Sequence, residues 1–143
     1  MIAKKFMEKA KRAAESAQTL LDTGDMEGAC DRAYYAMFNA ARAVLLVSDA
    51  KVPEEIARTH NGLISAFSLH LVKTNKVPVE YGKALNKVEE LRMIADYKGD
   101  PIESDRAAWA VDQSKLFVKK MCATFMPELD DKVNQSQNTN TLN

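Results

Sequence analysis

Hydrophobic side chains recur at steps of three and four residues along most of the chain, which is the period of an amphipathic α-helix. The pattern predicts five helical segments, separated by short polar stretches that contain Gly or Pro. Their expected bounds are 2–22, 26–47, 59–72, 78–95 and 103–126. We therefore expect an all-α fold, an up-and-down bundle of four main helices plus one shorter helix.

The residues between these segments suit helix ends. Gly24 favours the left-handed conformation that ends a helix, and Asp25 favours the N-cap of the next one. Pro78 fits the first turn of the fourth segment, and Ser104 or Asp105 is expected to cap the fifth. These positions support the expected boundaries.

Length and composition predict one globular domain with a polar extension. The chain has 143 residues, of which 46% are hydrophobic and 28% charged, close to the average for globular proteins. The helical bundle is expected to span residues 1–128. Residues 129–143 are rich in Asn, Gln, Ser and Thr and have almost nothing to bury, so we expect a disordered tail.

Charge and cysteine content exclude several classes of function. Twenty basic and twenty acidic side chains give zero net charge, which argues against avid non-specific DNA binding but not against a local pocket for one phosphate or a short RNA. Cys30 and Cys122 form neither a disulfide framework nor a zinc pattern. Without a signal-like segment or a run of about 18 apolar residues, we expect a cytoplasmic protein with no membrane contact.

Polar side chains recur along the second segment, at Arg32, Tyr35, Asn39 and Arg42. This spacing places them on one helix face. Two arginines and a phenol could bind phosphate and stack on a base. Spacing alone favours the alternative, an ordinary solvated face or a face that packs on another helix.

Two further groups are candidates for chemistry. Arg92 and Asp96 are four residues apart with Tyr97 adjacent, so they form either a plain surface ion pair or an arginine oriented toward a ligand. His60 lies at a helix start, where anions bind, although a capping or packing histidine is an equal alternative. We interpret His70, near a helix end, as structural.

Several motifs of known chemistry are absent from the sequence. There is no Glu-x-x-His pair, no His-Glu-x-x-His and no glycine-rich phosphate loop, so we expect neither a metal site nor a cofactor. Some aromatic and methionine side chains are expected to line the core or a partner interface: Tyr34, Met37, Phe38, Met93 and Trp109.

Four segments in register resemble a known family. Residues 30–43, Cys-Asp-Arg-Ala-Tyr-Tyr-Ala-Met-Phe-Asn-Ala-Ala-Arg-Ala, resemble the second-helix signature of HEPN domains, in the subgroup of small stand-alone proteins. Residues 58–62, 67–78 and 91–97 resemble the subgroup's Lys-Thr-His-Ser-Gly segment, the stretch after it and its Arg-x-x-Ala-Asp-Tyr motif. The resemblance covers roughly residues 13–121.

The resemblance implies a homodimer with its active site in a cleft between the two copies. Many members are metal-independent ribonucleases that act as toxins or in defence, often inhibited by a minimal nucleotidyltransferase antitoxin. Carried over by position, the catalytic candidates are Arg92, Asp96, Tyr97 and His60. The candidates for binding RNA or a nucleotide are Arg32, Tyr35 and Arg42.

The sequence departs from the family's catalytic motif, which is an Arg followed by four to six residues and then His. After Arg92, the required positions hold Tyr97, Lys98 and Gly99. Two hypotheses follow. The chain is an RNA-cleaving toxin whose proton transfer uses His60 or Tyr97, or it is a catalytically silent HEPN dimer that binds a nucleotide or a nucleotidyltransferase partner.

Overall fold

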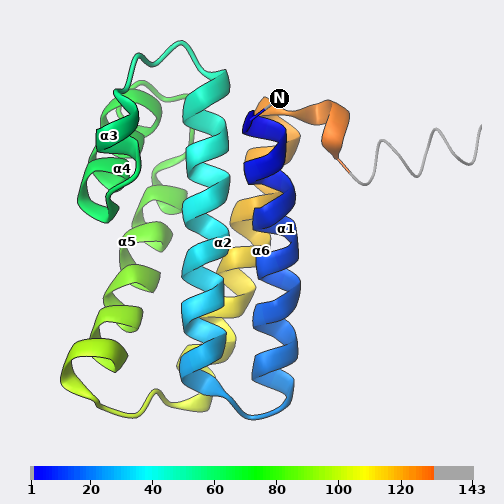
Figure 1. Cartoon of the computed structure of the whole chain (residues 1–143), viewed down its shortest axis with the longest axis vertical. Coiled ribbons are helices and arrows are strands. Elements are labelled where there is room, and N and C mark those ends of the chain that lie inside the picture. Colours follow the sequence, from blue (N-terminus) through cyan, green and yellow to red (C-terminus); the bar gives the residue numbers. More distant parts are fainter. Residues whose placement is uncertain (1, 131–143) are drawn as a thin grey trace, which may run out of the picture.

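The computed structural model describes residues 2–130, and all the regular elements in this range are helical. Four long helices lie side by side, and two short ones pack beside the end of the second (Figure 1). The long helices are α1 (Ile2–Asp22), α2 (Met26–Val47), α5 (Val79–Met93) and α6 (Ser104–Phe125), and the short ones are α3 (Glu54–Ala57) and α4 (His60–Phe67). The expected all-α class is confirmed. Most of the predicted tail, residues 131–143, lies outside the described residues.

The helix boundaries follow the hydrophobic pattern closely, with two kinds of difference. The bounds of α1 and α2 are the expected ones, whereas the third and fourth segments each end in a π-helical turn, Ser68–Val72 and Ile94–Lys98. The pattern missed α3 because a single helical turn is too short to show a period. It also missed the 3₁₀ turn at Pro127–Leu129.

Gly24 and Asp25 take their predicted places at helix ends, whereas the predictions for Pro78 and for the start of α6 are not met. Pro78 is the N-cap of α5 and precedes its first turn. Gly24 has a φ of 89°, in the left-handed region, and the Asp25 carboxylate accepts a hydrogen bond from the Gly28 amide at 2.9 Å. The N-cap of α6 is Glu103, whose side chain makes no capping bond, so neither Ser104 nor Asp105 caps this helix. Helix α6 therefore begins at Ser104, before the start that a cap at Ser104 or Asp105 would give.

Helix α2 lies at the centre of the fold. It packs against α1, α5 and α6, and Figure 1 shows it between α1 and α5. Small side chains on α1 and α2, such as Ala10, Ala33 and Ala40, are fully buried and let the two helices approach closely. Because α2 has neighbours on several sides, these neighbours decide what each of its polar side chains meets.

The remaining core is built from large apolar side chains and buried thiols. Phe67 of α4 packs on Phe117 of α6 with ring centroids 5.5 Å apart. Cys30 is fully buried, and burial, with a smaller contribution from Asp31, raises the pKa of its thiol to about 11. This thiol therefore remains protonated and weakly nucleophilic near neutral pH. No helix within residues 2–130 is long and apolar enough to cross a membrane.

Candidate functional site

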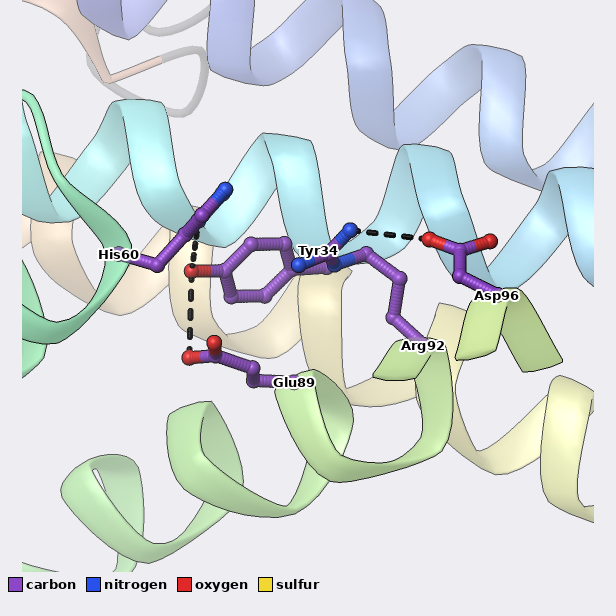
Figure 2. Close-up of polar contacts among 5 residues, drawn as sticks. All are labelled: Tyr34, His60, Glu89, Arg92 and Asp96. Atoms are coloured by element: carbon purple, nitrogen blue, oxygen red, sulfur yellow. Dashed lines mark hydrogen bonds and ion pairs between the residues drawn. The ribbon is translucent and has the colours of Figure 1, made fainter. Parts of the chain in front are cut away.

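A polar cluster lies where α2, the start of α4 and the C-terminal half of α5 meet (Figure 2). Tyr34 of α2 is at its centre, with its hydroxyl 2.8 Å from Nδ1 of His60 and 3.3 Å from Oε2 of Glu89. The guanidinium carbon of Arg92 lies 4.9 Å from the centroid of the Tyr34 ring. Asp96 lies beside Arg92, on the side that faces away from Glu89. Five polar residues from three separate chain segments thus form one group.

His60 is held in place by the turn before it. Thr59 is the N-cap of α4, and its hydroxyl accepts a hydrogen bond from the Gly62 amide at 3.0 Å. A Cβ atom at Gly62 would overlap the carbonyl oxygen of Ile56 and the hydroxyl of Thr59, so only glycine fits this position. The sequence Thr-His-Asn-Gly therefore fixes the His60 backbone where its ring reaches Tyr34.

His60 is exposed, yet its ring is packed on the side that faces α2. The ring centroid lies 5.4 Å from the centroids of both Tyr34 and Phe38. The two aromatic rings restrict the imidazole to one orientation, with its Nδ1 on the Tyr34 hydroxyl. The fold thus fixes the orientation of the His60 ring although the residue is exposed to solvent.

Arg92 is largely buried and uses little of its hydrogen-bonding capacity. Its side chain is 15% exposed, and its Nη1 pairs with Oδ2 of Asp96 at 3.0 Å. Its Nε is buried without a hydrogen-bond partner in the described part of the chain. A guanidinium has five N–H donors in a fork that matches phosphate, so most of its capacity is left for a ligand.

The backbone around Asp96 departs from α-helical geometry. Asp96 and Tyr97 lie in the π-helical turn Ile94–Lys98, which ends at Gly99 with a left-handed φ of 68°. Such turns occur often at functional sites. This one places the Asp96 carboxylate on the Arg92 guanidinium, so the spacing of four residues does make the predicted ion pair.

Electrostatics keep the Tyr34 hydroxyl protonated. Burial is the largest influence on it, and the neighbouring Glu89 carboxylate adds to it, so the pKa of Tyr34 lies well above its ordinary value of 10.0 despite the opposing charge of Arg92. Glu89 is itself 8% exposed. The phenol therefore acts as a donor to a buried carboxylate.

Three of the four predicted catalytic residues come together here, and the fourth does not. Arg92, Asp96 and His60 all belong to the cluster. Tyr97 is 78% exposed, and its side chain makes no hydrogen bond within residues 2–130. The Tyr97 side chain is therefore not tied into the cluster.

The predicted RNA-binding residues of α2 lie apart from the cluster. The guanidinium of Arg32 lies over the Tyr35 ring at 5.1 Å. The guanidinium carbon of Arg42 lies 4.3 Å from the centroid of the Phe6 ring of α1. Its Nη2 is 3.8 Å from Oε1 of Glu54, and the side chain lines a cavity of about 260 Å³. Their role in binding remains a prediction.

Asn39, between them, is buried and donates to the Tyr35 carbonyl of its own helix at 2.9 Å. The expected continuous polar face is therefore interrupted, because this part of α2 is covered by its neighbours.

Sequence reasoning missed two members of the cluster, Tyr34 and Glu89. Tyr34 was expected to line the core or a partner interface. It is 2% exposed, but its hydroxyl reaches two polar partners. A buried tyrosine usually finds a partner for its hydroxyl, so this residue carried a usable signal. Glu89 carried one too, since it lies three residues before Arg92 and hence on the same helix face.

The cluster's donors fit an anion. No group of three or more His, Cys, Asp or Glu side chains within residues 2–130 is arranged to hold a metal. The groups present can bind an oxyanion through the guanidinium and exchange a proton through the imidazole.

Comparisons with known proteins point to one family. Residues 3–123 match the model of the HEPN domain. A UPF0332 protein of Gloeobacter violaceus is 34% identical over 94 residues, which cover 66% of this chain and 71% of that protein. A protein of Methanocaldococcus jannaschii named "Putative toxin" is 27% identical over 117 residues, 81% of this chain and 76% of its own. A second protein of that name and organism is 29% identical over 116 residues, 81% and 83% of the two chains.

Proposed function

This chain belongs to the HEPN domain family, and from that premise we propose that it is a toxin-type endoribonuclease that cleaves RNA without a metal ion. The names of the two Methanocaldococcus relatives support a toxin role. The observation that carries the proposal is the meeting of Arg92 and His60 at Tyr34. It places the Arg92 guanidinium, which has N–H donors left for a phosphate, in the same site as the accessible His60 imidazole, although the two residues are 32 positions apart in the sequence.

Arg92 would bind the scissile phosphate. Its fork is held from one side by Asp96 and rests on the Tyr34 ring, so little conformational freedom is lost when an anion binds. The guanidinium would also stabilise the charge that accumulates on the non-bridging oxygens as the phosphorus becomes five-coordinate. This role would use the Nη donors that do not pair with Asp96, because Nε is buried.

His60 would move the proton. Its ring would take the proton of the RNA 2′-hydroxyl while the 2′-oxygen forms a bond to phosphorus. The bond between phosphorus and the 5′-oxygen breaks, and that oxygen takes a proton from solvent. The products are a 2′,3′-cyclic phosphate and a free 5′-hydroxyl, and His60 returns its proton to water to complete the cycle.

We propose further that the working form is a homodimer with its cleft at this cluster. Within one copy, the carboxylates of Glu89 and Asp96 outweigh the single charge of Arg92, a poor balance for binding a polyanion. Two-fold symmetry would bring the second copy's Glu89 and Asp96 along with its Arg92, so the added positive charge at the cleft would come from the exposed Arg58 of each copy. Light scattering that shows a monomer at micromolar concentration would contradict this part of the proposal.

A second function is favoured by one specific observation. In the family's catalytic motif, a histidine follows the arginine after four to six residues. In this chain those three positions after Arg92 hold Tyr97, Lys98 and Gly99, and Tyr97 is exposed. The alternative is a catalytically silent HEPN dimer. It would use Arg92 to bind a nucleotide, or would present the cluster to a minimal nucleotidyltransferase partner. Both functions place the protein in the cytoplasm.

RNA cleavage in the presence of EDTA separates the two functions. The purified full-length protein is incubated with total RNA, beside Arg92→Ala and His60→Ala variants. The nuclease proposal expects cleavage by the wild type in EDTA, 2′,3′-cyclic phosphate ends, and loss of both in each variant. His70→Ala and Arg106→Ala are the matched controls, because these residues lie outside the cluster, and they should cleave like the wild type.

The opposite outcome supports the alternative. Absence of cleavage by the wild type across varied RNAs, together with nucleotide binding that Arg92→Ala removes, would overturn the nuclease proposal. Equal loss of cleavage in His70→Ala would show that the assay reports folding instead of chemistry. Circular dichroism of every variant at the assay temperature excludes that reading.

A further inference from the structure

The contacts of the Tyr34 hydroxyl determine which nitrogen of His60 carries the proton. The hydroxyl has one hydrogen, and its two polar neighbours are Nδ1 of His60 at 2.8 Å and Oε2 of Glu89 at 3.3 Å. A carboxylate has no proton and only accepts, so the hydroxyl has to donate to Glu89. Nδ1 must then carry a hydrogen and donate it to the Tyr34 oxygen.

The opposite arrangement leaves a contact unsatisfied. If the Tyr34 hydroxyl donated to Nδ1, its oxygen and the Glu89 carboxylate would face each other as two acceptors inside the protein. Glu89 is 8% exposed, and its side chain makes no other hydrogen bond within residues 2–130 that would compensate for this repulsion. Burial therefore favours the arrangement in which Glu89, Tyr34 and His60 are linked by two hydrogen bonds, each with one donor and one acceptor.

We propose that Glu89 and Tyr34 are positioning residues that hold His60 in the Nδ1–H tautomer with its Nε2 free to accept a proton. The inference deepens the proposed nuclease function, because it assigns the atom of His60 that would act as the base. The logic is that of a carboxylate orienting a catalytic histidine through Nδ1–H, with a buried phenol inserted between them. Neither residue touches the substrate.

The surroundings of His60 also predict how its charge is stabilised. The charged and titratable groups that face it are Tyr34 from α2 and, beyond it, Glu89 and Arg92 from α5, while Arg58 precedes it in the chain. When His60 takes a proton at Nε2, the new positive charge interacts with Glu89 through the polarised Tyr34 hydroxyl.

The tautomer is tested directly by nitrogen-15 NMR of the histidine rings in the full-length protein above pH 8. The chain has two histidines, so His70 serves as an internal reference. We expect protonated Nδ1 and unprotonated Nε2 for neutral His60, and a shift toward the Nε2–H form in Tyr34→Phe and in Glu89→Gln. Tyr35→Phe and Glu90→Gln alter exposed neighbours of the same type and should leave the His60 signals unchanged.

The plateau rate of RNA cleavage, taken from a pH profile, gives a second readout. We expect Glu89→Gln to lower this rate roughly 10- to 100-fold, because His60 is no longer held in one tautomer. Tyr34→Phe should lower the rate similarly. Glu90→Gln should retain both the rate and the profile.

The outcomes distinguish this inference from the nuclease function. An Nε2–H tautomer in the wild type, or an Nδ1–H tautomer that survives both Tyr34→Phe and Glu89→Gln, overturns the inference even if the protein cleaves RNA. An Nδ1–H tautomer that depends on both residues upholds the inference even if no RNA is cleaved. Gln still offers an amide oxygen to the Tyr34 hydroxyl, so Glu89→Met, which keeps the length of the side chain but removes the acceptor, answers the question if Tyr34→Phe fails to fold.

Discussion

Helix α2 carries two tyrosines in succession, and the two sides of the helix that they mark differ in an instructive way. On the Tyr34 side, a buried hydroxyl meets His60 and Glu89, and Arg92 covers its ring. On the Tyr35 side, a half-exposed ring meets Arg32 of the same helix. Because adjacent residues on a helix point about 100° apart, one residue step decides which helices a side chain faces.

The comparison shows that a site of this kind is not found by looking for exposed polar residues. The Tyr35 side is the more polar one in sequence, yet its members contact each other or α1. The Tyr34 side is mostly apolar in sequence, yet α4 and α5 bring an imidazole, a carboxylate and a guanidinium to it (Figure 2). The site arises because separate helices bring these groups together, and burial strengthens the hydrogen bonds and charge interactions among them.

The largest expected difference between the two sides is in RNA cleavage. Arg92→Ala should lower the rate about 1,000-fold, because a guanidinium on the reacting phosphate stabilises charge that grows in the transition state. Arg32→Ala should change the rate only slightly. Initial rates on one labelled RNA at fixed ionic strength measure both, and comparable losses would mean that the Tyr35 side belongs to the active site.

Stability should separate the two tyrosines almost as strongly. Tyr34→Ala is expected to cost about 3–5 kcal/mol of unfolding free energy, because it opens a cavity and leaves Glu89 without its donor. Tyr35→Ala should cost less than about 1 kcal/mol, since its ring is 42% exposed. Urea denaturation followed by circular dichroism tests this, and similar midpoints would contradict the assigned burial.

High pH sharpens the same contrast. The raised pKa of Tyr34 means that the folded protein keeps a phenolic proton that the unfolded chain loses near pH 10. The stabilising contribution is therefore complete below about pH 10 and declines above it, by up to about 1.4 kcal/mol per pH unit. The stability difference between wild type and Tyr34→Phe should shrink as the pH rises from about 9 to about 11.

Tyr35→Phe is the matched control for this titration, and its difference from the wild type should not follow the same course. Urea midpoints at several alkaline pH values provide the measurement. A difference between wild type and Tyr34→Phe that grows with pH would reverse the sign and contradict the interpretation of Tyr34 as a buried donor.

The smallest expected effect belongs to Arg42. Replacing it with Gln removes the contact with Phe6 and a long ion pair with Glu54, which together should contribute about 0.5–1 kcal/mol. RNA cleavage should remain near the wild-type rate. A cleavage loss approaching that of Arg92→Ala would move Arg42 from a packing role to RNA binding and weaken the distinction between the two sides.

Much of the fold could be predicted from local sequence. The bounds of α1 and α2 follow from hydrophobic period and from the pair Gly24 and Asp25, because both signals act within a few residues. Glu103 and α3 escaped prediction for the same reason, since propensity is weak over a single turn and tertiary packing sets the boundary.

The candidate site was only partly accessible. Arg92 and Asp96 were identifiable as an i,i+4 pair, and His60 as a histidine at a helix start. Tyr34 and Glu89 carried only weaker signals, a buried tyrosine and a helix position near Arg92, because the contact that joins them is between residues 55 positions apart in the chain. No local pattern encodes which face of α2 turns toward α5.

The sequence by itself determined an all-α chain, the two long N-terminal helices, the helix start at which His60 lies, and the resemblance to HEPN domains. These depend on side-chain period, capping and motif spacing, all of which are local. Only the tertiary structure decided that Tyr34 would be the centre of a polar cluster and that Arg32, Tyr35 and Arg42 would lie apart from it. The reason is that burial and charge act between side chains that meet only when the helices pack.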